Sequence, residues 1–268
     1  MLTASTYHAS DGAAYEHFLG RWTKVLAPPF LDFAELPSDG PLLDVGTGTG
    51  SLAFAMAQRW PSRRILGVDV AEPYIAYAQS LAAGPSPAFE IADASTLPFQ
   101  DSTFCGATAQ LVLNFVPNAA AAVGEMKRVT TRGGTIAAAV WDFRGGLVFQ
   151  RILWDTAAGL DPQAGIARDR LFSSALALPD ALPQLFSAAG LGDVERGSIT
   201  IRMNFLDFDD YWQPLLGGQG PFGSYVATLS VDMRRRIEDA VRRAYCSGAP
   251  DGERSLTATA WAVRGRVQ

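Results

Sequence analysis

Three acidic residues and one run of glycines stand where they could bind a polar ligand. The run GTGTG, residues 46–50, directly follows the apolar segment LLDV, which contains Asp44. Asp69 and Asp93 follow the apolar segments ILGV and AFEIA. Alternating glycines indicate a turn that other residues cannot make, or a ligand that lies against bare backbone. Carboxylates beside such a turn could accept hydrogen bonds from ammonium, hydroxyl or amino groups.

Three kinds of ligand fit a glycine-rich turn after a strand, and the flanking residues separate them. A phosphate-binding loop requires Gly-Lys-Ser/Thr, but Gly50 is followed by Ser51 and Leu52. A dinucleotide site favours G-x-G-x-x-G, whereas this turn reads G-x-G-x-G. S-adenosylmethionine carries no phosphate, and its ammonium group suits the carboxylate of Asp44. A tight turn without a ligand is the remaining alternative.

The other two acids extend the same hypothesis. Asp69 lies about 20 residues beyond the glycines, where a carboxylate can accept two hydrogen bonds from ribose hydroxyls. Its alternative role is to cap the helix that follows. Asp93 could accept a hydrogen bond from an adenine amino group, while the backbone N–H of Ala94 meets a ring nitrogen. Three acids at three successive strand ends indicate a nucleoside-type ligand far more specifically than any one of them.

The elements that must position these residues alternate between strand and helix. Apolar runs predict strands over 41–46, 64–70, 88–93, within 104–115 and over 133–142, and amphipathic runs predict helices over 51–61, 72–84 and 119–130. This alternation predicts a parallel sheet with helices on both faces, and such sheets bind ligands at the carboxyl ends of their strands.

The second half of the chain is less regular. It predicts a helical patch over 147–160 followed by a polar stretch, a helix over 179–191, a strand over 193–205, a helix over 231–245 and a strand over 255–265. The first 40 residues precede the first strand, and we expect them to lie over the sheet as a cap.

Composition narrows the class of protein. The 268 residues are 48% hydrophobic and 18% charged, enough to bury a sizeable core. The net charge of −5 argues against non-specific binding of nucleic acid. Cys105 and Cys246 have neither metal-ligand spacing nor the pattern of a disulfide framework, which favours a reducing cytoplasm. We expect no membrane span, because no apolar run approaches about 20 residues, and no secretory signal.

The ordered motifs resemble class I S-adenosylmethionine-dependent methyltransferases. The motifs are LLDVGTGTG, GVDVAEPYIAYAQ, ADASTLPFQDSTFCGA and MKRVTTRGGTIAAAVWD. The nearest branch contains the ubiquinone/menaquinone-biosynthesis enzymes and many small-molecule methyltransferases. The resemblance is strong over 40–142 and loose over 180–265. It implies an α/β fold: a Rossmann-like, doubly wound sheet of seven strands, mostly parallel, with an antiparallel last strand inserted beside the fifth.

The same resemblance implies a set of cofactor-binding residues, with S-adenosylhomocysteine as the product. By position these are Asp44, Gly46, Thr47, Gly48 and Gly50 at the methionine part, Asp69 and Val70 at the ribose, Asp93 and Ala94 at the adenine, and Gln110 beside the sulfonium. It also implies one methyltransferase domain over 1–268. Its expected parts are a helical cap (1–38), a cofactor-binding core (39–142), a substrate-side insertion (143–178) and a C-terminal part with an inserted helical segment (179–268).

The expected cap carries further candidates. Arg21 could pair with the cofactor carboxylate, and Tyr15 could close over the methionine moiety. Alternatively, Tyr15, Phe18 and Trp22 form only the apolar stripe of an amphipathic helix. Methyl transfer is an in-line displacement that depends mainly on alignment, so a general base is needed only where the acceptor must lose a proton. His8 and His17 could act so, but ordinary polar roles suit them better, and we assign no catalytic residue.

The methyl acceptor is expected to be a small molecule, without involvement of nucleic acid or metal. Trp141 should border the site, with walls from Phe149, Trp154, Phe172 and the stretch 208–225, although each aromatic could equally pack in the core. An aromatic, glycine-rich surround suggests a small apolar or aromatic acceptor. The alternatives are a protein that binds the cofactor without catalysis, or a dinucleotide-dependent oxidoreductase.

Overall fold

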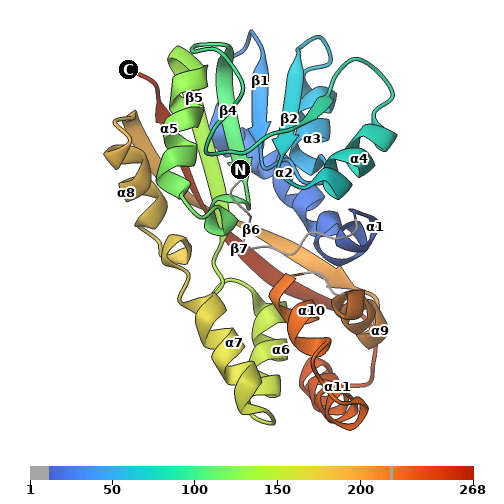
Figure 1. Cartoon of the computed structure of the whole chain (residues 1–268). Helices are drawn as coiled ribbons and strands as arrows, with labels where there is room; N and C mark the ends of the chain where they lie inside the picture. Colours follow the sequence, from blue (N-terminus) through green and yellow to red (C-terminus); the bar gives the residue numbers. More distant parts are fainter. Residues whose placement is uncertain (1–11, 218–219) are drawn as a thin grey trace.

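A computed structural model describes residues 12–217 and 220–268. Its described residues form a seven-stranded sheet in the order β3-β2-β1-β4-β5-β7-β6 (Figure 1). The strands are β1 (Leu42–Val45), β2 (Ile65–Asp69), β3 (Ala88–Ile91), β4 (Phe104–Gln110), β5 (Thr130–Trp141), β6 (Gly192–Phe205) and β7 (Arg254–Arg266).

The direction of the strands confirms the predicted fold class. β1 pairs in parallel with β2 and β4, and the parallel pairing continues to β3 on one side and β5 on the other. The last strand, β7, is antiparallel and lies between β5 and β6. The strand order therefore reverses at β1, which places the glycine turn at the point where such sheets bind ligands.

Helices cover both faces of the sheet and also stand beyond one of its edges. They are α1 (Gly12–Tyr15), the π-helical turn η1 (Glu16–Gly20), α2 (Arg21–Ala34), α3 (Ser51–Arg59), α4 (Glu72–Leu81), η2 (Leu113–Phe115), α5 (Ala119–Val129), α6 (Val148–Ala158), α7 (Pro162–Phe172), η3 (Ala175–Ala177), α8 (Ala181–Ala188), α9 (Phe208–Trp212), η4 (Gln213–Gly217), α10 (Gly220–Val226) and α11 (Val231–Cys246).

Alternation along the buried strands produces two cores. Leu42 packs with α2, α3 and α4 on one face, whereas its neighbour Leu43 packs with α5 and α8 on the other. Successive side chains of a strand point to opposite faces, so a strand buried on both sides reads as a continuous apolar run. This is the pattern that predicted the parallel sheet.

The expected N-terminal cap is divided between two roles. α2 packs against α3 and the strands β5, β6 and β7, and it buries Leu26, Phe30 and Ala34 completely. It is therefore one of the helices that cover the sheet. Among the described N-terminal residues, α1, η1 and the first turn of α2 reach the ligand-binding edge of the sheet. The apolar stripe of Tyr15, Phe18 and Trp22 correctly predicted helical structure in this segment. A stripe does not show, however, which other element of the protein its apolar side packs against.

A lobe of helices stands beyond the carboxyl edge of the sheet. Figure 1 shows α6, α7, α9, α10 and α11 below the sheet, with the long strands β6 and β7 reaching toward them. α7 occupies the stretch expected to be polar and irregular. Asp161 caps it by accepting a hydrogen bond from the backbone N–H of Gln163 at 3.0 Å, and Pro162 begins it. In the described residues, no helix combines the length and apolar character needed to cross a membrane.

Candidate active site

One large cavity lies between the carboxyl edge of the sheet and the helical lobe. It encloses about 1500 Å³ of space, including solvent at its mouth. Its lining changes in chemical character from one side to the other, so we describe the cavity in two parts. We call the part lined by residues 46–49, Asp44, Asp69 and Asp93 the polar half. The part lined by Phe18, Trp141, Phe143, Phe149, Trp154 and Phe222 is the aromatic half.

The glycine turn leaves bare backbone facing the polar half. Gly48 has a φ of +55°, and a Cβ built there would meet no atom within 4 Å. The space beside its backbone is therefore free for a ligand. Gly46 has a φ of +68° and excludes a side chain for a different reason, because a Cβ would approach Val112 to 2.3 Å. Gly50 begins α3 and lies outside the lining of the cavity.

Asp44 is a buried carboxyl at the end of β1. Only 1% of its surface is exposed, and burial raises its pKa to about 7, although two side chains oppose that change. The hydroxyl of Thr47 donates to Oδ2 at 2.8 Å, and that of Thr108 donates to Oδ1 at 3.2 Å. Hydroxyls stabilise a carboxylate less than a cation does, so an ammonium group in the cavity fits this donor set.

Asp69 and Asp93 reach the same edge from β2 and from the turn after β3. Asp69 accepts hydrogen bonds from the backbone N–H groups of Gly48 and Ala71, both at 2.9 Å, and burial raises its pKa. Each carboxylate oxygen has a second acceptor position, so two hydroxyls can still bind. Asp93 accepts from the N–H of Ser95 at 2.8 Å and is 7% exposed. Val70 and Ala94 line the cavity beside these acids.

Gln110 joins the two halves at the end of β4. Its Nε2 donates to the backbone carbonyl of Thr23 at 3.1 Å, which fixes the orientation of the amide because a carbonyl can only accept. Its Oε1 is buried and has no hydrogen-bond partner among the described residues. The next residue, Leu111, has a positive φ of 64° and also lines the cavity. Such backbone strain is common at functional sites.

The N-terminal candidates separate in the structure. Tyr15 lines the cavity, and its ring lies 5.1 Å from that of Tyr74. Arg21 lies outside the lining: Nη1 donates to Oδ1 of Asp210 at 2.6 Å, Nη2 donates to the backbone carbonyl of Asp210 at 3.0 Å, and the guanidinium covers the ring of Trp22. Arg21 pairs here with a residue of α9 and does not face the cavity, so its pairing with the cofactor carboxylate stays a prediction that this geometry does not support. Sequence spacing could not reveal a partner 189 residues away.

The one described histidine candidate for a general base, His17, does not line the cavity. His17 is exposed on η1, and His8 lies outside the described residues. Within the described chain, the lining residues include no lysine, arginine, histidine or cysteine. The electrostatic character of the polar half thus comes from its three aspartates and its backbone N–H groups.

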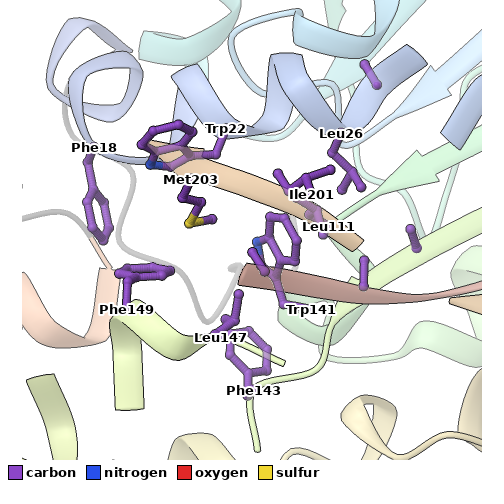
Figure 2. Packing of buried hydrophobic residues seen from close by; sticks show 14 of the residues in the cluster. Phe18, Trp22, Leu26, Leu111, Trp141, Phe143, Leu147, Phe149, Ile201 and Met203 are labelled. Carbon is purple, nitrogen blue, oxygen red and sulfur yellow. The ribbon is translucent and has the colours of Figure 1, made fainter. Parts of the chain in front are cut away.

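The aromatic half is assembled from η1, β5 and the lobe. Figure 2 shows Phe18 of η1 above Phe149 of α6, with Trp141 and Phe143 on the side of the sheet. Trp141, Phe149 and Trp154 therefore lie at the cavity as expected from the sequence. Phe172 does not: it lies outside the lining, where the guanidinium of Arg151 covers its ring.

Sequence reasoning missed several lining residues. Thr23, Thr49 and Ser51 present hydroxyls near the glycine turn, and Gln150 is a polar residue on the lobe side. The π-helical turn η1 brings Glu16 to the hydroxyl of Thr49, whose hydrogen it accepts. Of these residues, only Gln150 carried a signal in the sequence, because it is a polar residue within the apolar stripe of the helix predicted over 147–160.

Comparisons with known proteins agree with this geometry. Residues 42–134 match the family described as methyltransferase domain. The chain is 37% identical over 171 residues to a demethylmenaquinone methyltransferase of Roseiflexus castenholzii, covering 59% of this chain and 70% of that protein. It is 34% identical over 162 residues to a demethylmenaquinone methyltransferase of Thermus thermophilus, covering 56% of this chain and 73% of that protein.

Solved structures share the fold at low sequence identity. Phosphoethanolamine N-methyltransferase 2 of Haemonchus contortus, crystallised with S-adenosyl-L-methionine, matches with a TM-score of 0.59 and 13% identity, covering 96% of this chain and 57% of that one. The cyclase SpnF matches with a TM-score of 0.54 and 21% identity, covering 98% of this chain and 87% of that one. Because one fold serves different reactions, the sequence relatives carry the assignment. The chain belongs to the class I S-adenosylmethionine-dependent methyltransferases, and it transfers a methyl group from that cofactor to a small molecule.

Proposed function

We propose that the polar half of the cavity binds S-adenosylmethionine and that the aromatic half binds a flat, largely apolar methyl acceptor of the aromatic or quinone type. The observation that carries this proposal is the continuity of the two halves within one cavity. A donor site and an acceptor site that share one space can align a methyl donor with its acceptor. The names of the demethylmenaquinone methyltransferase relatives support a quinone-type acceptor.

The residues of the polar half fit the three parts of the cofactor. Asp44 would pair with the ammonium group, and the backbone at Gly48 would lie against the methionine moiety. Asp69 would accept hydrogen bonds from the ribose hydroxyls, and Asp93 from the adenine amino group. The hydroxyl of Ser51, with the backbone N–H groups at the N-terminus of α3, would hold the carboxylate in place of Arg21.

Bound S-adenosylmethionine supplies a methyl group already activated by its sulfonium. The chain's own residues are left with alignment and the exclusion of water. Phe18, Trp141 and Phe149 form an apolar wall that would hold the acceptor and keep solvent from the reacting centre. Tyr15 packs against the tilted ring of Tyr74 at the other side of the cavity and would cover the methionine moiety.

The state of the two cysteines supports a proposal about the cellular compartment. Cys105 and Cys246 are both free thiols. Free thiols suit a reducing compartment, so we propose a cytoplasmic enzyme.

Two measurements test the proposal. Isothermal titration should show that S-adenosylhomocysteine binds with micromolar affinity, about −8 kcal/mol, and that NAD binds far more weakly. Transfer of radiolabelled methyl groups should then be screened over phenols, quinols, amines and carboxylic acids. We expect products among the phenols and quinols. Products confined to amines or acids would contradict the proposed acceptor class, and preferred binding of NAD would contradict the proposed cofactor site.

A further inference from the structure

Helix α6 presents one polar side chain to the cavity. Its buried residues are Phe149, Gln150, Leu153, Trp154 and Ala157, which form a single face of the helix. All but Gln150 are apolar, and Gln150 is only 9% exposed. A leucine at this position would continue the stripe, so the presence of an amide needs an explanation.

The amide of Gln150 is not explained by contacts within the protein. Its Oε1 is buried and has no hydrogen-bond partner among the described residues. The side chain lines the cavity together with Phe149, Leu153 and Trp154. An unpaired buried amide oxygen destabilises the folded protein, and most such groups in native structures are paired. The neighbouring Arg151 differs, since its side chain is partly exposed and pairs with Asp155 at 2.7 Å.

The surroundings of Gln150 show what could pair with it. Its helix belongs to the lobe, whereas the acids of the polar half end strands of the sheet. Its lining neighbours on α6 are aromatic or aliphatic. An acceptor oxygen in an apolar wall matches a ligand with a flat apolar body and a hydroxyl group, because the hydroxyl donates the hydrogen bond that Oε1 lacks.

We infer that Gln150 selects the methyl acceptor, by accepting a hydrogen bond from a hydroxyl group on an aromatic ring of the phenol or quinol class. The inference rests on the proposed function, in which the aromatic half holds the acceptor. A site built to bind a substrate hydroxyl rejects an analogue that lacks it, because the buried partner is then left unpaired. Gln150 would therefore discriminate among rings of the same shape.

The test compares two ligands of nearly equal shape, 1-naphthol and 1-methylnaphthalene, by isothermal titration against the full chain saturated with S-adenosylhomocysteine. Wild type should bind 1-naphthol about tenfold more tightly. Gln150→Leu should bind both with similar affinity and should leave the affinity for S-adenosylhomocysteine unchanged. It should also raise the unfolding midpoint, because an unpaired amide is replaced by an apolar side chain. Gln150→Met serves as a second variant with a flexible side chain, in case leucine does not fit.

A matched control is Gln163→Leu, which changes an exposed glutamine on α7 that does not line the cavity. It should keep the wild-type preference for 1-naphthol. If Gln150→Leu or Gln150→Met also keeps that preference, or if wild type has none, the inference is wrong while the aromatic site stands. If S-adenosylhomocysteine binds but neither naphthalene compound does, the proposed aromatic acceptor is wrong, and the inference falls with it.

Discussion

The polar and aromatic halves of the cavity are built from the chain in opposite ways. In the polar half, each acid stands at or just after the end of its own short strand, so Asp44, Asp69 and Asp93 meet because three parallel strands end at one edge. In the aromatic half, η1, β5, α6 and α10 contribute residues from distant parts of the sequence. The first arrangement follows from local pattern and topology, whereas the second depends on how a lobe packs.

This difference has a functional consequence. A cofactor common to many enzymes can be held by backbone and by residues whose positions the sheet itself determines. An acceptor that differs between enzymes is contacted by inserted helices, which can change without disturbing the sheet. Changes to the polar half should therefore act on every reaction of the enzyme, and changes to the aromatic half on the choice of acceptor.

The largest effect is expected from Asp44→Asn. Loss of a buried charge that pairs with an ammonium group should weaken S-adenosylhomocysteine by about 3–5 kcal/mol, measured by isothermal titration. The free protein should become more stable, because the variant no longer holds a buried carboxyl that can ionise. Asp39→Asn, at an exposed position, is the control for both measurements. A variant that binds with wild-type affinity would remove Asp44 from the cofactor site.

Asp69→Ala should have a smaller effect of about 1–3 kcal/mol on binding, the usual consequence of leaving ligand hydroxyls unpaired. Adenosine and S-adenosylhomocysteine both carry the ribose, so both should lose affinity equally. Asp69 also accepts the N–H of Gly48 at 2.9 Å, and the circular dichroism and unfolding midpoint of the variant must therefore be checked. Unchanged affinity in a folded variant would leave Asp69 with a capping role alone.

The sequence predicted the polar half well for a physical reason. An apolar run that ends in an acid or a glycine turn is a local signal, and it indicated the three aspartates and the glycine turn. The resemblance and the expected cap added the other residues, and ten of the twelve predicted cofactor residues line the cavity, Gly50 and Arg21 being the exceptions. The aromatic half was predicted only in part. The partner of Arg21 and the buried state of Gln150 depend on contacts between distant segments, which periodicity does not encode. Helix α7 begins with the local signals of Asp161 and Pro162, but its weak apolar stripe hid it.

The affinity for S-adenosylhomocysteine should change about tenfold per pH unit below pH 7. Burial raises the pKa of Asp44 to about 7, above the ordinary value of 3.8. Between about pH 4 and 7, Asp44 is therefore protonated in the free folded protein but ionised in the unfolded chain. The contribution of Asp44 to the free energy of unfolding consequently falls as the pH rises through that range. Binding of an ammonium ligand requires the ionised form, so affinity should fall about tenfold per unit as pH drops below 7.

Titrations with S-adenosylhomocysteine between pH 5.5 and about 8 would measure this dependence. Asp44→Asn should abolish it, since the amide does not ionise. Adenosine, which lacks the ammonium group, should bind with little change over the same range. A wild-type affinity that is flat below pH 7 would show that Asp44 is not the partner of the ammonium group.

The smallest effect on cofactor binding is expected from Arg21→Ala. This variant tests most directly whether the polar half depends on a residue that contacts the lobe. Arg21 is bound to Asp210 and packs on Trp22 and Phe205, so it joins the N-terminal helix to the lobe. Its side chain is 28% exposed, and a partly exposed pair of this kind contributes about 1 kcal/mol or less. We expect a modest fall in the unfolding midpoint, matched by Asp210→Asn, and equally small losses for S-adenosylhomocysteine and adenosine. A loss of about 10–150-fold confined to S-adenosylhomocysteine would instead show that Arg21 leaves Asp210 to bind the cofactor carboxylate. The polar half would then depend on a residue that links it to the lobe, and the contrast between its local construction and the packed aromatic half would no longer hold.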